Sequence, residues 1–481
     1  MEGSGSRRAA GATGRSGSPR RPIERRGYDR EPASGGRRTA PPYRRGDGVP
    51  VVTSDSTGNA PGRETDSDTA FSPAWEVAGV NDRTDPWQVL GGCFLLSVGV
   101  NAFVIAPSSV APPFAERFGV ATAAVGDVVS AAILGVILVQ IPAGYLLDRF
   151  DNRRLVVPAV GLYVLVTLGA QGVGSFDALL GLRVLGGVLV GFVFTAGANV
   201  VAEVFPPERR GLATGLYLAS PPTSFAFAHA SGPFVAESYG PLRVFLLPAA
   251  VAVLGAALFA LAAREPVRTG STPTASEFAR ALGNRSVLVV GLSAFAAYAL
   301  YLFLNTWLPT YGTTVLSLPL PVAGLVTAVV PLVGIVARPG GGWVSGRLGG
   351  RRRPVLAGGL LLGLVLLVAV PFADGTALFL LLVAGAAFAV QLGTGVYYVL
   401  TRELAAPGTE GTSLTVLTAV SFTGSFAAPV VGGWLVEGYS WTAAFLVFAG
   451  VGLLGALVLL LVPEPGEGER PEGIPGRGTD A

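Results

Sequence analysis

Apolar stretches of about 20 residues, separated by short polar breaks, follow one another from Trp87 to about residue 462. Stretches of this length are typical of helices that cross the hydrocarbon core of a bilayer. Glycine and proline are frequent inside them, and a membrane tolerates this because neighbouring helices can satisfy freed backbone groups. The pattern predicts an all-α membrane protein with twelve transmembrane helices, near residues 88–108, 122–146, 155–174, 177–202, 211–235, 242–263, 286–310, 321–346, 354–373, 377–400, 412–436 and 442–462.

Three segments lack such stretches. Residues 1–86 are rich in Gly, Ser, Pro, Arg and Asp, and they cannot bury enough apolar surface to offset their ordering entropy. We therefore expect a disordered tail there, and a second one at residues 463–481. The polar, positively charged loop at residues 264–285 divides the remainder into two six-helix halves, residues 87–263 and 286–462.

The two halves repeat each other in sequence. Early in each half the offset is 198 residues, matching Gly144 to Gly342. Later it is 200, as in Glu237 and Glu437. Because each half has an even number of helices, both insert the same way up, and an axis along the membrane normal relates them. We expect the binding site between these pseudo-symmetric halves.

Arginine placement predicts the orientation. With the N-terminus inside, the inner loops carry fourteen arginines and the outer loops carry two, Arg117 and Arg243. Cytoplasmic loops are the ones that collect positive charge. We therefore expect a multi-pass protein of the cell (plasma) membrane, with both termini, both tails and the central loop cytoplasmic.

The composition excludes several functions. The chain is 51% apolar and 14% charged, and all 34 of its cationic residues are Arg, which removes P-loop ATPases, retinal Schiff bases and pyridoxal enzymes. One Cys, Cys93, and one His, His229, cannot build a disulfide, a zinc site or a haem held by two histidines. We expect no cofactor and no metal. Nucleic acid is not an expected partner, because the arginines lie where membrane topology places them.

The loop after the second predicted helix, residues 144–154, reads GYLLDRFDNRR. It resembles the G-x-L-x-D-R-x-x-R-R loop of the major facilitator superfamily, whose members have paired six-helix halves. The resemblance implies that this loop latches the cytoplasmic gate in one of two states. Gly144 would let a neighbouring helix approach, and Asp148 would pair with Arg149, Arg153 or a facing helix N-terminus. The alternative is an ordinary positive anchor with a local ion pair.

Residues 342–353, GWVSGRLGGRRR, echo that loop after the eighth helix. Gly342, Arg347 and Arg351 keep the pattern. Gly346 stands where the first half has Asp148, so we expect a weaker second latch.

Arg338 is the arginine that we expect deepest in the membrane. The run from Arg338 to Arg353 resembles helix eight of nitrate/nitrite and related organic-anion porters of this superfamily. The chain departs from nitrate porters because Gln140 stands at the aligned position in helix two, and because residues 219–224 read ASPPTS in helix five. These departures argue against nitrate, and we expect a substrate with an anionic group that pairs with Arg338. The alternative is a structural Arg338 whose partner is Asp127, Asp148 or a backbone carbonyl.

Arg183, with Gly187 and Gly191, resembles the family's R-x-x-x-G-x-x-x-G pattern. The two glycines lie one turn apart and permit close helix packing. A charge at membrane depth costs about 2.5 to 3.5 kcal/mol, so Arg183 should face the cavity or the outer rim. Alternatively it extends its charge to the interface from near the helix start.

The other buried polar candidates for substrate binding or coupling could equally be interhelical contacts worth about 0.6 kcal/mol each. Asp127 and His229 can titrate. Asp127, in helix two, could instead be a solvated residue at the outer rim. The candidates are Asn101, Asp127, Gln140, Asn199, His229, Tyr301, Asn305, Tyr311, Gln391, Tyr397 and Tyr398.

These features predict a monomeric secondary transporter that moves a small solute across the bilayer by alternating access, with ion or proton coupling. A solute sensor on a transporter scaffold is the alternative. A channel fits poorly because the gate loop is repeated in two halves. A membrane enzyme fits poorly because the chain has a single His and a single Cys.

Overall fold

The computed structural model describes residues 85–263 and 275–464, apart from the side chains of residues 275–278. Every regular element among them is a helix, which confirms the all-α prediction. The first half contains α1 (Pro86–Ile105), η1 (Ala106–Val110), α2 (Ala111–Phe118), η2 (Thr122–Ala124), α3 (Val125–Arg149), α4 (Asn152–Gln171), α5 (Phe176–Val204), α6 (Pro207–Tyr217), α7 (Ser220–Tyr239), η3 (Pro241–Phe245) and α8 (Leu246–Ala262). The rest contains α9 (Ala275–Gly283), α10 (Arg285–Thr314), α11 (Leu320–Arg347), α12 (Arg353–Ala369), η4 (Val370–Phe372), α13 (Thr376–Leu404), α14 (Glu410–Gly438), α15 (Trp441–Val458) and η5 (Leu459–Leu461).

Eleven segments of the described chain are long and apolar enough to cross a membrane. The fifth predicted helix, residues 211–235, is missing from these eleven because it is divided into α6, which ends at Tyr217 and is too short, and α7, which begins at Ser220 and is too polar. The prediction of one continuous helix there was wrong. Pro221 and Pro222 lack an N–H and fit best in the first turn of a helix, where that group would have no partner, so a new helix starts at this point. The polar helix α7 packs against α1 and α11. Together with the eleven apolar segments it makes a bundle of twelve long helices among the described residues.

The central loop was also predicted incompletely. It contains the helix α9, and Asn284 then caps α10 by accepting a hydrogen bond from the Ser286 N–H at 3.1 Å. Residues 264–274 lie outside the described residues. So do most of the two predicted tails.

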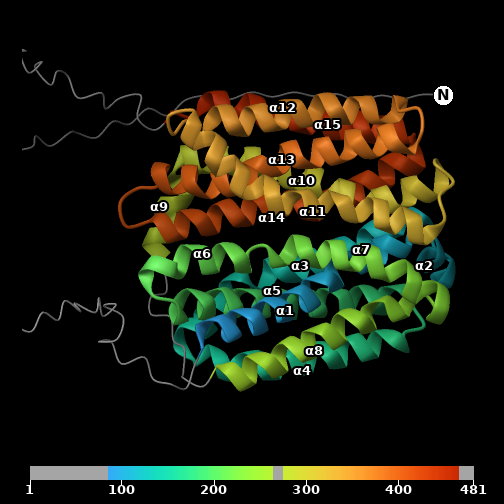
Figure 1. The fold of residues 1–481 in the computed structure, drawn as a ribbon, viewed down its shortest axis with the longest axis horizontal. Helices are drawn as coiled ribbons and strands as arrows, with labels where there is room; N and C mark the ends of the chain where they lie inside the picture. Colours follow the sequence, from blue (N-terminus) through green and yellow to red (C-terminus); the bar gives the residue numbers. More distant parts are fainter. Residues whose placement is uncertain (1–84, 264–274, 465–481) are drawn as a thin grey trace, which may run out of the picture. The chain divides into compact units, whose positions relative to one another are not determined.

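The two halves pack their helices in corresponding ways. The pairs α3–α5 and α11–α13 occupy equivalent places, and the halves meet through α3–α14 and α7–α11 (Figure 1). A side chain at Gly187 would collide with the main-chain oxygen of Ala132, and one at Gly191 would press on Val139. The predicted close packing at these two glycines is confirmed.

At one end of the bundle, which we call the closed end, the halves touch directly. It comprises η1, η2, the first turns of α3 and α11 and the last turns of α7 and α14. Ser130 of α3 donates a hydrogen bond to the Phe426 carbonyl of α14 at 2.6 Å. A side chain at Gly126 would collide with the Pro429 carbonyl, and one at Gly324 with the His229 carbonyl.

At the opposite end, which carries residues 144–154 and 342–353 and which we call the open end, the glycines have space. A side chain at Gly144, Gly342 or Gly346 would meet nothing within 4 Å. The close helix approach predicted at Gly144 is therefore absent from this conformation. Nearby on α3, Ile141 is 68% exposed.

Candidate functional site

The candidate site is a cluster of polar side chains from three helices of the second half, which we call the Arg338 cluster. Tyr298 and Tyr301 come from α10, Arg338 from α11, and Gln391 and Thr394 from α13. Together with Ala297 and Val390 they line a small cleft, whose interior of about 10 Å³ suits roughly one water molecule.

The first half reaches this cluster through α7. The ring of Phe225 stacks on the ring of Tyr301, with centroids 6.0 Å apart and planes 10° apart. The Arg338 guanidinium carbon lies 5.8 Å from the centroid of the same Tyr301 ring. Tyr301 therefore contacts both halves.

No described residue forms a hydrogen bond with the Arg338 side chain. Its Nε is buried without an acceptor, and no carboxylate of the described residues forms an ion pair with it. A buried guanidinium donor without an acceptor carries a desolvation cost that an oxyanion would relieve.

Gln391 adds a second unsatisfied group to the cluster. Its amide Nε2 donates to the Val330 carbonyl at 2.9 Å, which holds the side chain against α11. Its Oε1 is buried without a donor and lies over Gly334, where any side chain would displace it. Gln391 is one of the buried polar candidates of the sequence, whereas Tyr298 and Thr394 were not among them.

Asn305 and His229 lie together between the halves. The Asn305 amide donates to the Tyr301 carbonyl at 2.7 Å, and the Ser108 hydroxyl donates to the Asn305 carbonyl at 3.3 Å. The fully buried His229 ring has the Asn305 side chain as its polar neighbour. Among the described residues, the two ring nitrogens of His229 have no hydrogen-bond partner. The Oδ1 atom of Asn305 has none either.

Other predicted residues lie on the helices of the first half. The Asn101 amide donates to Ser97, whose hydroxyl is in turn linked to Ser220, so this chain of contacts joins α1 to α7. The side chains of Asp127 and Gln140, both on α3, are half-buried. Neither side chain forms a hydrogen bond with another described residue. Their roles in binding or coupling stay predictions.

Arg183 is fully buried, and each of its three guanidinium nitrogens donates to a main-chain carbonyl. It donates to Val128 at 2.9 Å, to Val104 at 2.7 Å and to Phe103. Its guanidinium carbon also lies 4.1 Å from the centroid of the Phe103 ring. These contacts tie α5 to α1 and α3 and favour a structural role over the predicted role in binding.

Comparison with known proteins identifies the family. The family model described as "Major Facilitator Superfamily" matches residues 91–401 and 349–480 of this chain. The chain belongs to the Major Facilitator Superfamily. It is therefore a multi-pass membrane transporter by family, and a small molecule is the expected cargo.

Relatives within the superfamily are distant. A D-galactonate transporter of Escherichia coli O6:H1 is 25% identical over 72% of this chain and 88% of its own length. A protein of Thermus thermophilus described as "Probable nitrate/nitrite antiporter NarK1" is 28% identical over 50% of this chain and 57% of its own length. A crystal structure of a bacterial homologue of the human lysosomal transporter Spinster, inward-facing and occupied, shares the fold with a TM-score of 0.63 at 18% identity. That match covers 79% of this chain and 96% of the homologue.

The superfamily loop at residues 144–154 lies at the open end. The Arg149 guanidinium lies 4.4 Å from the Tyr145 ring, and Arg347 lies 3.6 Å from Trp343 at the equivalent place in the second half. Asp148 is half-buried in the last turn of α3. The gating role of this loop and of Arg153 and Arg351 stays a prediction.

The second loop has a network that the sequence analysis missed. Arg352 pairs with Glu403 at 2.9 Å and donates to Ser345 at 2.7 Å. The Glu464 carboxylate accepts the main-chain N–H groups of Arg352 and Arg353 at the start of α12. The second loop has no aspartate at Gly346, but it receives carboxylates from Glu403 and Glu464, which are distant in sequence. A local motif could not reveal these contacts.

Proposed function

We propose that this protein is a secondary transporter of a small anion, with Arg338 as the group that binds the anionic part of the substrate. The observation that carries the proposal is the buried, unpartnered Nε of Arg338 in a cleft that both halves approach. A guanidinium binds carboxylates and oxyanions through parallel N–H bonds, which lysine cannot reproduce.

The chemistry of the relatives supports an anion. D-galactonate is a carboxylate, and nitrate and nitrite are oxyanions. Tyr298, Thr394 and the Gln391 Oε1 could hydrogen-bond hydroxyl groups beside the anionic group. A hydroxylated carboxylate offers partners to all of these groups, whereas a bare oxyanion does not, and its binding requires the one-water cleft to widen as the halves move.

Transport by alternating access is supported by the difference between the two ends of the bundle. At the closed end, backbone of the other half occupies the space beside Gly126 and Gly324. At the open end, the space beside Gly144 and Gly342 is empty. A second state would exchange these roles, since the halves are repeats of each other. With the N-terminus in the cytoplasm, as arginine placement favours, this state is open to the cytoplasm.

The test is binding and flux of D-galactonate by purified protein. We expect D-galactonate to raise the melting temperature and to be accumulated by proteoliposomes when an ion gradient is imposed. Separate pH and sodium gradients distinguish proton from sodium coupling. Binding without flux under all gradients would favour the sensor alternative, and flux without saturation would favour a channel. Failure of every carboxylate and oxyanion to bind would contradict the anion proposal.

A further inference from the structure

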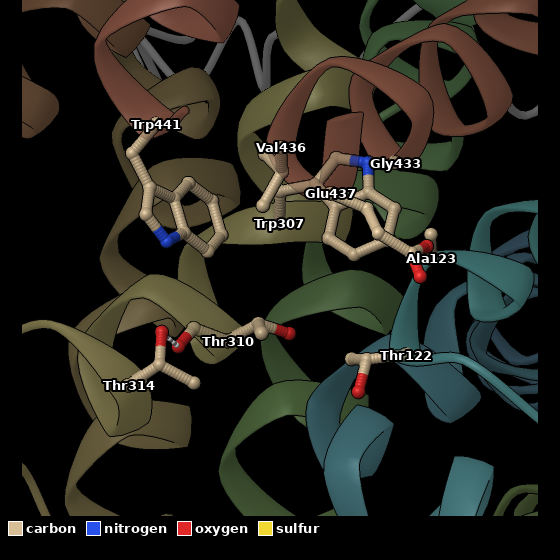
Figure 2. A pocket seen from close by; sticks show the side chains of 9 residues that line it. All are labelled: Thr122, Ala123, Trp307, Thr310, Thr314, Gly433, Val436, Glu437 and Trp441. Atoms are coloured by element: carbon tan, nitrogen blue, oxygen red, sulfur yellow. Dashed lines mark hydrogen bonds between the residues drawn. The ribbon is translucent and has the colours of Figure 1, made fainter. Parts of the chain in front are cut away.

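A second cavity lies at the closed end and is separate from the Arg338 cluster. Figure 2 shows it with Trp441 and Thr314 on one side, and Thr122 and Ala123 across the space. Its volume is about 270 Å³, close to the lower end of small-molecule sites, about 300 Å³. The lining residues are Thr122, Ala123, Trp307, Thr310, Thr314, Gly433, Val436, Glu437 and Trp441.

Both halves are needed to build this cavity. Thr122 and Ala123 belong to η2 of the first half, whereas the other lining residues belong to α10, α14 and α15. A side chain at Gly433 would press on both the Trp307 ring and the Ala123 carbonyl, so the halves are in contact beside the cavity. If the closed end opened, its first-half wall would move away.

The lining groups suit a small organic cation. The Trp307 indole is held by a hydrogen bond of 3.0 Å from its Nε1 to the Pro429 carbonyl, and Trp441 supplies a second indole. Indole faces attract cations that carry apolar groups. Glu437 is the single charged residue among those that line the cavity. The buried Thr310 hydroxyl oxygen has no partner and can bond a polar group of the ligand.

The surrounding charge points the same way. Apart from the fully buried Arg183, the described residues at this end include six carboxylates and two arginines, which favours cations over anions in the approach to the cavity. The residues counted are Glu116, Asp127, Asp177, Glu237, Asp374, Glu437, Arg117 and Arg243.

We propose that this cavity is a binding site for a small organic ammonium ion, and that its occupation holds the closed end shut. The ammonium lies among the indoles and beside the Glu437 carboxylate, and a hydroxyl on the ligand bonds Thr310. Because a ligand that prefers one conformation shifts the population toward it, such a cation acts as a brake on transport. The proposal does not depend on the identity of the transported substrate.

The test uses choline and its uncharged isostere 3,3-dimethylbutan-1-ol as probes, with tryptophan fluorescence of the purified protein as the readout. We expect saturable choline binding that is at least tenfold tighter than binding of the isostere. Glu437→Gln should weaken choline binding at least tenfold. The matched control is Glu237→Gln, the equivalent exposed carboxylate in the first half, which does not line the cavity and should change nothing. Equal binding of the two probes, or equal effects of the two variants, would overturn the proposal.

A third variant tests the dependence on conformation. Gly324→Leu places a side chain against the His229 carbonyl, at the α7–α11 contact of the closed end, and should wedge this end apart without touching Glu437 or the Pro429 carbonyl that holds Trp307. Choline binding should then fall at least tenfold, and unchanged affinity in folded protein would refute the need for a closed end. If this variant does not fold, Trp441→Leu serves in its place. It should weaken choline at least fivefold while leaving the isostere unchanged, and a smaller effect would contradict the indole contact.

Discussion

Arg183 and Arg338 carry the same charge within the membrane-spanning helices but have opposite surroundings. Carbonyl groups of α1 and α3 accept hydrogen bonds from the Arg183 guanidinium, whereas the Nε of Arg338 is a buried donor without an acceptor among the described residues. A satisfied charge stabilises the packing of its neighbours, and an unsatisfied one is available to a ligand. The two residues therefore give distinguishable phenotypes.

Arg338→Lys should weaken binding of the transported anion at least tenfold, about 1.4 kcal/mol, although the charge is kept. Lysine offers a point charge instead of two parallel donors. Isothermal titration of the substrate identified by thermal shift measures the effect. The control Arg243→Lys, an exposed arginine at the closed end, should bind normally. Normal binding by the Arg338 variant would assign Arg338 to structure.

Arg183→Met should destabilise the protein by about 2 to 4 kcal/mol, because three buried carbonyls lose a charged donor. The melting temperature of detergent-solubilised protein should fall, and substrate affinity of the fraction that remains folded should be unchanged. A loss of affinity with unchanged melting temperature would place Arg183 in the binding site.

At the scale of elements, the helix pairs depend on glycines that lie against the backbone of a partner. Gly187 of α5 lies against Ala132 of α3, whereas Gly181, on the same helix, faces open space. Glycine at such crossings lets helices approach closely enough for extensive van der Waals contact. The element pattern thus follows from small residues at one-turn spacing.

Gly187→Val should prevent α3 and α5 from packing, so that folded protein no longer elutes as a single species in size-exclusion chromatography. Gly181→Val adds the same side chain to the same helix without a collision and is the control. Comparable yields of folded protein from both variants would contradict the close contact at Gly187.

The sequence predicted those elements whose cause is local. Long apolar runs, the two loops and the glycine spacing on α5 were legible because each depends on neighbours in the chain. The break before α7 was missed, although Pro221 and Pro222 were a signal that a helix should restart there. The carbonyl partners of Arg183 and the acidic partners of Arg352 come from other helices, and only tertiary packing could show them.

Asp148→Asn should lower transport at least tenfold while leaving the helices folded, because the superfamily loop is expected to latch the open end when it closes. Gly346 occupies the equivalent place in the second half and has space for a side chain, so Gly346→Ala should transport normally. Counterflow in proteoliposomes, with circular dichroism as the folding check, compares the two. Equal, normal flux would refute the latch.

At the scale of the whole molecule, the proposed alternating access requires the two ends to close in turn, and the sequence repeat offers two equivalent sets of contacts for this. The contacts α3–α14 and α7–α11 both join the two halves and are pseudo-equivalent to each other, because α11 repeats α3 and α14 repeats α7. A rocking motion about these contacts would leave the Arg338 cluster between the halves and expose it to alternate sides. The glycines at the open end would then come to lie against the opposite half.

Gly144→Trp should therefore trap the present conformation. The indole fits without collision here, because nothing lies within 4 Å of a side chain at Gly144, but it would obstruct closure of the open end. We expect substrate binding to be retained and transport to be lost. Gly358→Trp, at an exposed glycine of α12 that also has open space, is the control and should transport normally. Normal transport by Gly144→Trp would show that the open end does not close at this residue, and alternating access would then need a different contact surface.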